Sequence, residues 1–151
     1  MCGICGELTF DGAQVSAATI VAMRDRLEHR GPDDQGVFIS DDRRAGLGFR
    51  RLAIIDVSPI ANQPMANEDG SVRVAFNGEI YNFKDLRARL LAGGHQFRSQ
   101  SDTEVLVHLY EDAGPAFVEQ IDGMFAIALW DARNRRLVLA RDRAGKKPLY
   151  V

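Results

Sequence analysis

Residues 125–130 read Phe-Ala-Ile-Ala-Leu-Trp, and residues 137–140 read Leu-Val-Leu-Ala. Both stretches are apolar at every position, and a turn around Asn134 joins them. Because successive side chains of a strand point to opposite faces, two such strands need cover on both sides. Two packed sheets with helices outside them would provide that cover. These residues therefore predict a layered protein of helices and largely antiparallel strands.

The apolar periodicity of the rest of the chain predicts further strands and helices. Strands are expected at residues 2–10, 37–40, 45–49 and 72–76. Helices are expected to begin at Ser16, Asn82 and Ser101. Gly-Pro or Gly-Gly pairs follow each of them, so that the helices would end near Arg30, Gly93 and Gly114.

The composition is that of an ordinary globular domain. The 151 residues suit one compact domain, and 46% are hydrophobic while 26% are charged. A net charge of −2 gives no electrostatic reason to expect nucleic acid or an anionic membrane as a partner. No apolar run is long enough to span a bilayer, and the N-terminus does not have the layout of a signal peptide. We therefore expect a cytoplasmic protein.

Two cysteines, Cys2 and Cys5, have the C-x-x-C spacing of zinc and redox sites. A zinc site takes about four ligands, but there is no second cysteine pair, and the histidines at 29, 95 and 108 are scattered along the sequence. A redox motif usually opens a helix that follows a strand. Residues 2 and 5 of a strand would also point to opposite faces. We therefore predict no metal site, and we interpret Cys5 as a small core residue.

Cys2 directly follows the initiator methionine, which is a special position for a thiol. Its small side chain permits removal of Met1, which leaves a free α-amine with a pKa of about 8. Such an amine can act as the base for the nucleophile of its own residue. A cysteine at position 2 is more often incidental, so the neighbouring motifs decide how it is interpreted.

Four motifs stand in order along the chain: Cys2-Gly3-Ile4-Cys5-Gly6, His29-Arg30-Gly31-Pro32-Asp33, residues 76–82 (Phe-Asn-Gly-Glu-Ile-Tyr-Asn) and residues 101–104 (Ser-Asp-Thr-Glu). Together they resemble the class II glutamine amidotransferases, which have the N-terminal nucleophile hydrolase fold. Within that class the chain is most similar to the glutaminase domain of asparagine synthetase, and blocks at 51–56, 62–65, 123–126 and 140–150 extend the match. The resemblance implies an α+β fold over residues 1–151, a four-layer α/β/β/α sandwich of two mainly antiparallel sheets.

The resemblance also implies a role for particular residues. Cys2 would attack the side-chain amide of L-glutamine, and the Asn77 side chain with the Gly78 N–H would form the oxyanion hole. Arg51 would bind the carboxylate of glutamine, whereas Glu79 and Asp102 would bind its ammonium group. The remaining expected glutamine-binding residues are Leu52, Ile54 and Ile55.

Several of these residues also have simpler interpretations. Asn77-Gly78 is typical of a hairpin turn after a strand end, and Arg51 follows another arginine, as solvated surface charges often do. Ser101-x-x-Glu104 has the pattern of a helix capping box. In that interpretation the negative charge of Asp102 would only stabilise the helix by interacting with its dipole. We interpret His29 as structural or as a neighbour of the site. Phe49 departs from the family pattern, since many relatives have a histidine there.

The motifs of an ATP-dependent synthetase are missing from these 151 residues. The Ser-Gly-Gly-x-Asp-Ser pyrophosphate loop does not occur, nor does a Gly-x-x-x-x-Gly-Lys-Ser/Thr loop. We expect no cofactor in this domain. We also expect the full-length protein to contain a C-terminal synthetase domain that uses ATP and magnesium. Two alternatives stay open at this point. The partner domain could amidate another carboxylate, or the domain could be catalytically silent and serve regulation.

Overall fold

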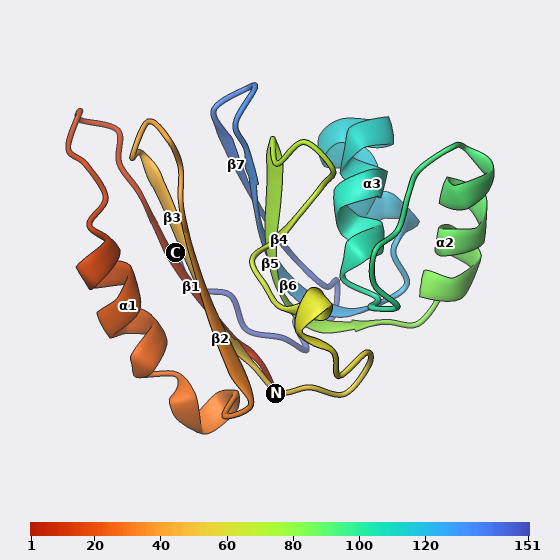
Figure 1. Ribbon diagram of the computed structural model, residues 1–151, viewed down its shortest axis with the longest axis horizontal. Coiled ribbons are helices and arrows are strands. Elements are labelled where there is room, and N and C mark those ends of the chain that lie inside the picture. The colour runs from red at the N-terminus through yellow and green to blue at the C-terminus, as the bar shows by residue number, and fades with distance from the viewer.

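The computed structural model describes residues 1–151 as four stacked layers (Figure 1). Helix α1 covers a three-stranded sheet, which faces a four-stranded sheet, and α2 and α3 lie beyond the second sheet. This arrangement confirms the predicted α/β/β/α sandwich of antiparallel sheets. None of the helices has both the length and the apolar character that a bilayer crossing requires.

The first sheet has the strand order β1-β3-β2. Its strands are β1 (Gly3–Leu8), β2 (Asp34–Ile39) and β3 (Ala45–Arg51). Alternation along β3 directs Ala45 and Leu47 towards the second sheet, where they pack in an apolar cluster with Trp130. The intervening positions face α1 (Ala17–Asp25), and Cys5 lies on this outer side beside Gly48.

The second sheet has the order β4-β5-β6-β7. Its strands are β4 (Met65–Ala66), β5 (Val72–Ile80), β6 (Gly123–Asp131) and β7 (Arg136–Arg141). One face of β6 contributes Phe125, Ile127 and Leu129 to the largest apolar cluster, which α2 (Phe83–Ala92) and α3 (Glu104–Ala113) complete. The opposite face contributes Ala128 and Trp130 to the layer between the sheets.

The prediction of strands buried on both faces is confirmed for 125–130 and wrong for 137–140. Residues 125–130 are all buried. Strand β7 is an edge strand that pairs only with β6, so its outer side has no neighbouring strand to cover it. The side chains of β7 are at most partly buried, and Leu139 is 39% exposed.

Two helix boundaries differ from the prediction. Helix α1 begins after Ser16 as expected but ends at Asp25, and a separate 3₁₀ turn covers Glu28–Arg30. Helix α3 begins at Glu104 rather than next to Ser101. The predicted capping box does not form, because the Glu104 carboxylate accepts hydrogen bonds from the backbone N–H groups of Arg98 and Ser99 in the preceding loop.

The expectation that Asn77-Gly78 follows a strand end is also wrong. Strand β5 continues to Ile80, and Asn77 and Gly78 pair with Ala126 and Phe125 of β6. The hairpin-turn interpretation is thereby excluded. The remaining elements are 3₁₀ turns at Pro59–Ala61 and Gly114–Gln120.

Candidate active site

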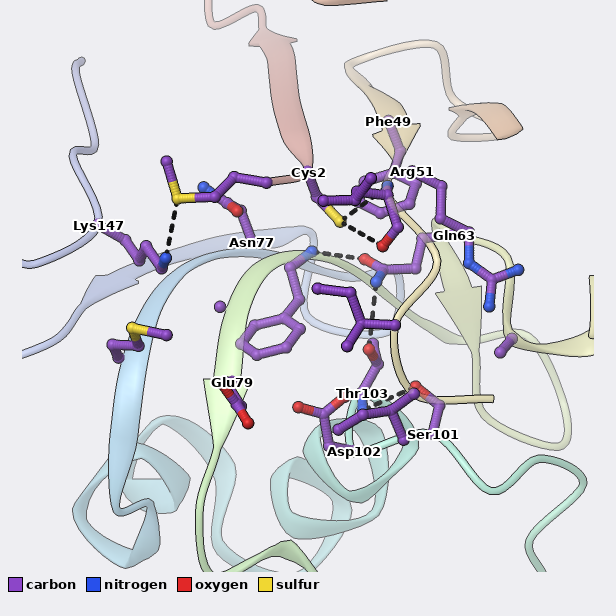
Figure 2. Close-up of a pocket in the computed structure, with 18 residues that line it drawn as sticks. Cys2, Phe49, Arg51, Gln63, Asn77, Glu79, Ser101, Asp102, Thr103 and Lys147 are labelled. Carbon is purple, nitrogen blue, oxygen red and sulfur yellow. Dashed lines mark hydrogen bonds between the residues drawn. The ribbon is translucent and has the colours of Figure 1, made fainter. Parts of the chain in front are cut away.

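A pocket lies at the end of the sandwich where β1, β3 and β5 approach one another (Figure 2). It brings together all nine residues that the sequence analysis selected: Cys2, Arg51, Leu52, Ile54, Ile55, Asn77, Gly78, Glu79 and Asp102. Ile54 and Glu79 are the exposed members, and 75% of the Ile54 surface is accessible. The fold therefore collects these residues from segments a hundred positions apart, while their chemical roles stay predictions.

Cys2 precedes β1 and directs its thiol into the pocket. The Leu52 N–H donates to Cys2 Sγ over 3.4 Å, and the Arg30 Nε–H donates to the Cys2 carbonyl over 3.2 Å. Arg30 can approach because the chain packs tightly at Gly31, where a Cβ atom would lie 2.5 Å from the backbone of Arg50. The His29–Pro32 motif thus positions Cys2 through Arg30, whereas His29 itself is exposed and does not line the pocket.

Cys5 differs from Cys2 in direction and surroundings. It faces α1 on the other side of the first sheet, so the two cysteines point to opposite faces as predicted. Its expected place in the core is only partly correct, because the side chain is half-buried. Burial raises the pKa of the Cys5 thiol, which makes it a poorer nucleophile at neutral pH.

Asn77 and Gly78 form the wall of the pocket on β5. Alternation places Asn77 on the inner face of the sheet, two residues after Ala75, which packs between the sheets. Asn77 is buried with 5% exposure. A Cβ atom at Gly78 would lie 2.1 Å from the Met124 carbonyl oxygen, so only glycine fits there without displacing β6.

Glu79 and Asp102 supply two carboxyl groups to the same pocket. The Ile80 N–H donates to Asp102 Oδ2 over 3.1 Å. Burial raises the pKa of Asp102, and the nearby charge of Glu79 adds to this effect. Neither carboxyl group takes part in an ion pair within the protein. The site therefore favours a positively charged group from outside.

Arg51 is a buried residue with 5% exposure, so its interpretation as a solvated surface charge is wrong. Its guanidinium donates to the carbonyl oxygens of Ser58, at 2.8 Å, and of Asp56. These bonds hold the segment that carries Leu52, Ile54 and Ile55. A guanidinium has five N–H donors, so three remain for a further acceptor.

A family model described as a glutamine amidotransferase domain matches residues 1–151. The chain belongs to this family. This match agrees with the resemblance that the sequence motifs indicated and with the observed four-layer fold.

Curated relatives of this amidotransferase domain are asparagine synthetases. The chain is 45% identical to asparagine synthetase [glutamine-hydrolyzing] 2 of Bacillus subtilis (strain 168), over 99% of this chain and 20% of the relative. It is 46% identical to asparagine synthetase [glutamine-hydrolyzing] 2 of Arabidopsis thaliana, over 100% of this chain and 25% of the relative. The chain thus spans about a fifth to a quarter of the length of these relatives.

A solved structure gives the same fold. The glutamine phosphoribosylpyrophosphate amidotransferase from B. subtilis, complexed with ADP and GMP, superposes with a TM-score of 0.73. The match covers 92% of this amidotransferase domain and 37% of the other chain, at 21% sequence identity. At that identity the likeness concerns the fold alone.

The sequence analysis missed several residues of the amidotransferase pocket. Gln63 is buried beneath it, where its Oε1 accepts from the Phe76 N–H over 2.6 Å and its Nε2 donates to Thr103 Oγ1 over 3.1 Å. It therefore links β5 to the start of α3. The motif at 62–65 was the only signal for this residue, because a buried glutamine with two long-range partners leaves no periodic pattern.

Lys147 was also missed. It is buried with 6% exposure, lines the pocket, and forms no ion pair. Its Nζ donates to Met1 Sδ over 3.0 Å, so the residue next to Cys2 occupies part of the pocket (Figure 2). Phe49 lines the pocket as well and is fully buried.

Proposed function

We propose that the domain hydrolyses the side-chain amide of L-glutamine to glutamate and ammonia, with Cys2 as the nucleophile. The Cys2 thiol attacks the amide carbonyl while the α-amine of Cys2 takes the thiol proton. The protonated α-amine gives this proton to the amide nitrogen, so that ammonia leaves as a γ-glutamyl thioester forms. Water then hydrolyses the thioester and releases glutamate and the free thiol.

One observation carries the proposal: a thiol and two unpaired carboxyl groups share one pocket. Free glutamine has an amide at one end and an ammonium group at the other. Glu79 and Asp102 suit the ammonium, because an incoming positive charge compensates two carboxylates that form no ion pair within the protein. The amide would then reach towards Cys2.

The oxyanion that forms during attack needs preorganised donors. Asn77 and Gly78 lie in the wall of the pocket that holds Cys2, and they bring a side-chain amide and a backbone N–H to it. Such donors contribute about 3–4 kcal/mol each when they are fixed in place beforehand. Since both residues belong to a paired strand, their positions need little rearrangement on binding.

The carboxylate of glutamine is assigned to Arg51. Two N–H groups of Arg51 donate to backbone carbonyls of the segment after β3, and its other N–H groups remain for the substrate. Leu52, Ile54 and Ile55 belong to that same segment and line the pocket. Arg51 would thus bind glutamine directly and also shape the wall against which glutamine packs.

The proposal requires the removal of Met1. While Met1 is attached, the nitrogen of Cys2 is an amide and has no lone pair basic enough to accept the thiol proton. Met1 also lines the pocket beside the nucleophile. Because the thiol must stay reduced, we place the domain in the cytoplasm, where disulfides are rare.

We further propose that the ammonia is consumed by a C-terminal synthetase domain that uses ATP and magnesium to form asparagine. The support is the similarity to asparagine synthetases that are four to five times longer than the region matched. A synthetase that amidates another carboxylate is the alternative, and the substrate pocket of that second domain would separate the two.

The direct test is a glutaminase assay on protein whose N-terminus is verified as Cys2. Cys2→Ala should reduce glutamate release to background while circular dichroism and the unfolding temperature stay close to wild type. Cys5→Ala is the matched control and should keep most of the activity, because Cys5 faces α1. An inactive Cys5 variant together with an active Cys2 variant would refute the assignment, and no activity in the wild type would favour a regulatory domain.

A further inference from the structure

A second group of ionisable side chains lies away from the catalytic pocket, around the C-terminal half of α3. His108 belongs to α3, His95 follows α2, and Glu68 lies between β4 and β5. The sequence analysis treated the histidines as scattered, which is wrong for this pair: the ring centroids of His95 and His108 are 4.8 Å apart. The fold brings them together because α2 packs against α3.

The donor atoms of this group lie close together. Glu111 Oε2 lies 3.0 Å from His108 Nδ1 and 3.6 Å from His95 Nδ1. Glu68 Oε2 lies 3.8 Å from His108 Nδ1. One donor atom from each of Glu68, His95 and His108 can be chosen so that all lie within 4.8 Å of one another. Bonds of about 2.0–2.1 Å in tetrahedral geometry place ligand atoms about 3.3 Å apart, so only a small contraction is needed.

The surrounding contacts already orient these donors. Asn67 Nδ2 donates to Glu111 Oε1 over 2.7 Å, which leaves Oε2 for the imidazoles. The Gln96 N–H likewise donates to Glu68 Oε1 over 3.4 Å, and Glu68 Oε2 faces His108. Outer contacts that fix carboxylates in this way are typical of metal sites.

His95 has the contact that most favours a metal over a plain ion pair. Its Nε2 lies 2.9 Å from Asp112 Oδ1, on the side away from Nδ1. A histidine that binds a metal through one nitrogen usually donates the other N–H to a carboxylate, which fixes the tautomer and makes the ligand more basic. With Nε2–H donated to Asp112, the Nδ1 lone pair of a neutral His95 faces Glu111 Oε2, a contact that a metal ion or a second ring proton would make favourable.

Burial and charge agree with this interpretation. His108 is 1% exposed and its ring packs edge-on against Phe97, so its Nδ1 is held in place. Its Nε2 is buried without a hydrogen-bond partner, so His108 lacks the outer acceptor that His95 has in Asp112. Glu68, Glu111 and Asp112 form no ion pair with lysine or arginine, so a divalent cation would balance their charge.

We propose that Glu68, His95, His108 and Glu111 bind one divalent transition-metal ion, with Asp112 as the acceptor for His95. Mixed imidazole and carboxylate ligands at these spacings suit zinc. The ion would join the segments before β5 and after α2 to helix α3, whose N-cap residue Thr103 lines the catalytic pocket. Its role would be structural.

The experiment is zinc titration by calorimetry on chelator-treated protein with the Cys2→Ala change, so that the catalytic thiol does not compete. One zinc ion should bind per chain and raise the unfolding temperature. Glu68→Ala and His95→Gln should abolish the saturable binding, and Asp112→Asn should weaken it about 10- to 100-fold. His29→Gln is the matched control and should bind zinc normally, because His29 is exposed and remote from the group.

Two results would overturn the proposal. One is the absence of saturable zinc binding, together with an unfolding temperature that depends on pH but not on zinc. That result would show that protonated imidazoles pair with the carboxylates and that no metal is bound. The other is equal zinc affinity in wild type, Glu68→Ala and His95→Gln, which would place the ion elsewhere. Glu68 is partly exposed, with 39% of its side chain accessible, so its variant tests the site without disturbing the core. The readout is binding and stability, so it is independent of glutaminase activity.

Discussion

The layer between the second sheet and its helices differs from the layer between the two sheets. The first contains a cluster of 17 buried apolar residues, drawn from β5, β6, α2 and α3 among others. The second contains only five, of which three are alanines: Ala45, Ala75, Ala128, Leu47 and Trp130. The side of the second sheet that faces the helices therefore provides most of the apolar burial.

The smaller layer is where the pocket lies. Along β3, the inner face runs from Ala45 and Leu47 to Arg51, and along β5 it runs from Ala75 to Asn77 and Glu79. The same alternation thus gives apolar packing at one end of the sandwich and polar pocket walls at the other. The separation of stability from function is incomplete, because Phe76 and Ala61 belong to the cluster of 17 residues and also line the pocket.

The largest stability effect is expected on the helix-facing side. Leu129→Ala removes a fully buried side chain from the cluster of 17 residues, so it should cost about 4–5 kcal/mol in the free energy of unfolding. Leu47→Ala, in the smaller cluster, should cost about 2–3 kcal/mol, since fewer apolar neighbours surround it. Urea unfolding of both variants measures the difference. A larger loss for Leu47→Ala would reverse the comparison.

The next effect concerns the chemical step. Asn77→Ala should lower kcat about 100- to 1000-fold, because it removes a donor that acts on the developing oxyanion. The KM for glutamine should change much less, since the donor matters most in the transition state. Steady-state kinetics test this, with the unfolding temperature as the control for folding. Unchanged turnover would remove Asn77 from the oxyanion role.

A smaller effect is expected for the groups that bind the ends of glutamine. Arg51→Ala and Asp102→Asn should mainly raise KM, because their partners are charges distant from the reacting amide. Glutamine binding should also weaken as pH falls, when Asp102 gains a proton. Burial raises the pKa of Asp102, so this loss should begin at a higher pH than for an ordinary carboxyl group. Kinetics at a series of pH values would show it, and an acid limb that persists unchanged in Asp102→Asn would contradict it.

The smallest effect is a gain in stability. Because the pKa of Asp102 is raised in the folded protein, its ionised form disfavours folding, and this cost grows as pH rises through that pKa. Asp102→Asn removes the charge and can still accept from the Ile80 N–H. Without glutamine it should therefore raise the unfolding temperature slightly at neutral pH and have no such effect in acid. A lower unfolding temperature at neutral pH would show that the carboxylate is compensated in the free protein.

The features that the sequence predicted correctly are those with a local or repeated signal. The run at 125–130 predicted a strand buried on both faces. The nine residues that the family motifs selected line one pocket, while their roles stay predictions. The errors arose where long-range neighbours decide the outcome. Residues 137–140 resemble 125–130 but form an edge strand, and Glu104 binds the loop before α3 instead of capping with Ser101. The proximity of His95 to His108 likewise depends on how α2 packs on α3.

Lys147 and Gln63 illustrate the same limit within the site. A buried lysine next to Met1 follows no periodicity, and its place in the motif at 140–150 was the only signal for it. Gln63 contacts Phe76 and Thr103, which are 13 and 40 residues away. The polar end of the layer between the sheets is therefore harder to predict than its apolar end, because each polar side chain has individual partners.

The central claim is that Cys2 acts as a nucleophile with its own α-amine as base, and the state of Met1 tests it most directly. Two preparations of the same chain should be compared in a glutaminase assay: one shown by mass spectrometry to begin at Cys2, and one with an N-terminus that retains Met1. We predict that the first hydrolyses glutamine and that the second is inactive, while both unfold at a similar temperature. Full glutaminase activity in protein verified to retain Met1 would contradict the account, because the nitrogen of Cys2 would then be an amide throughout the reaction.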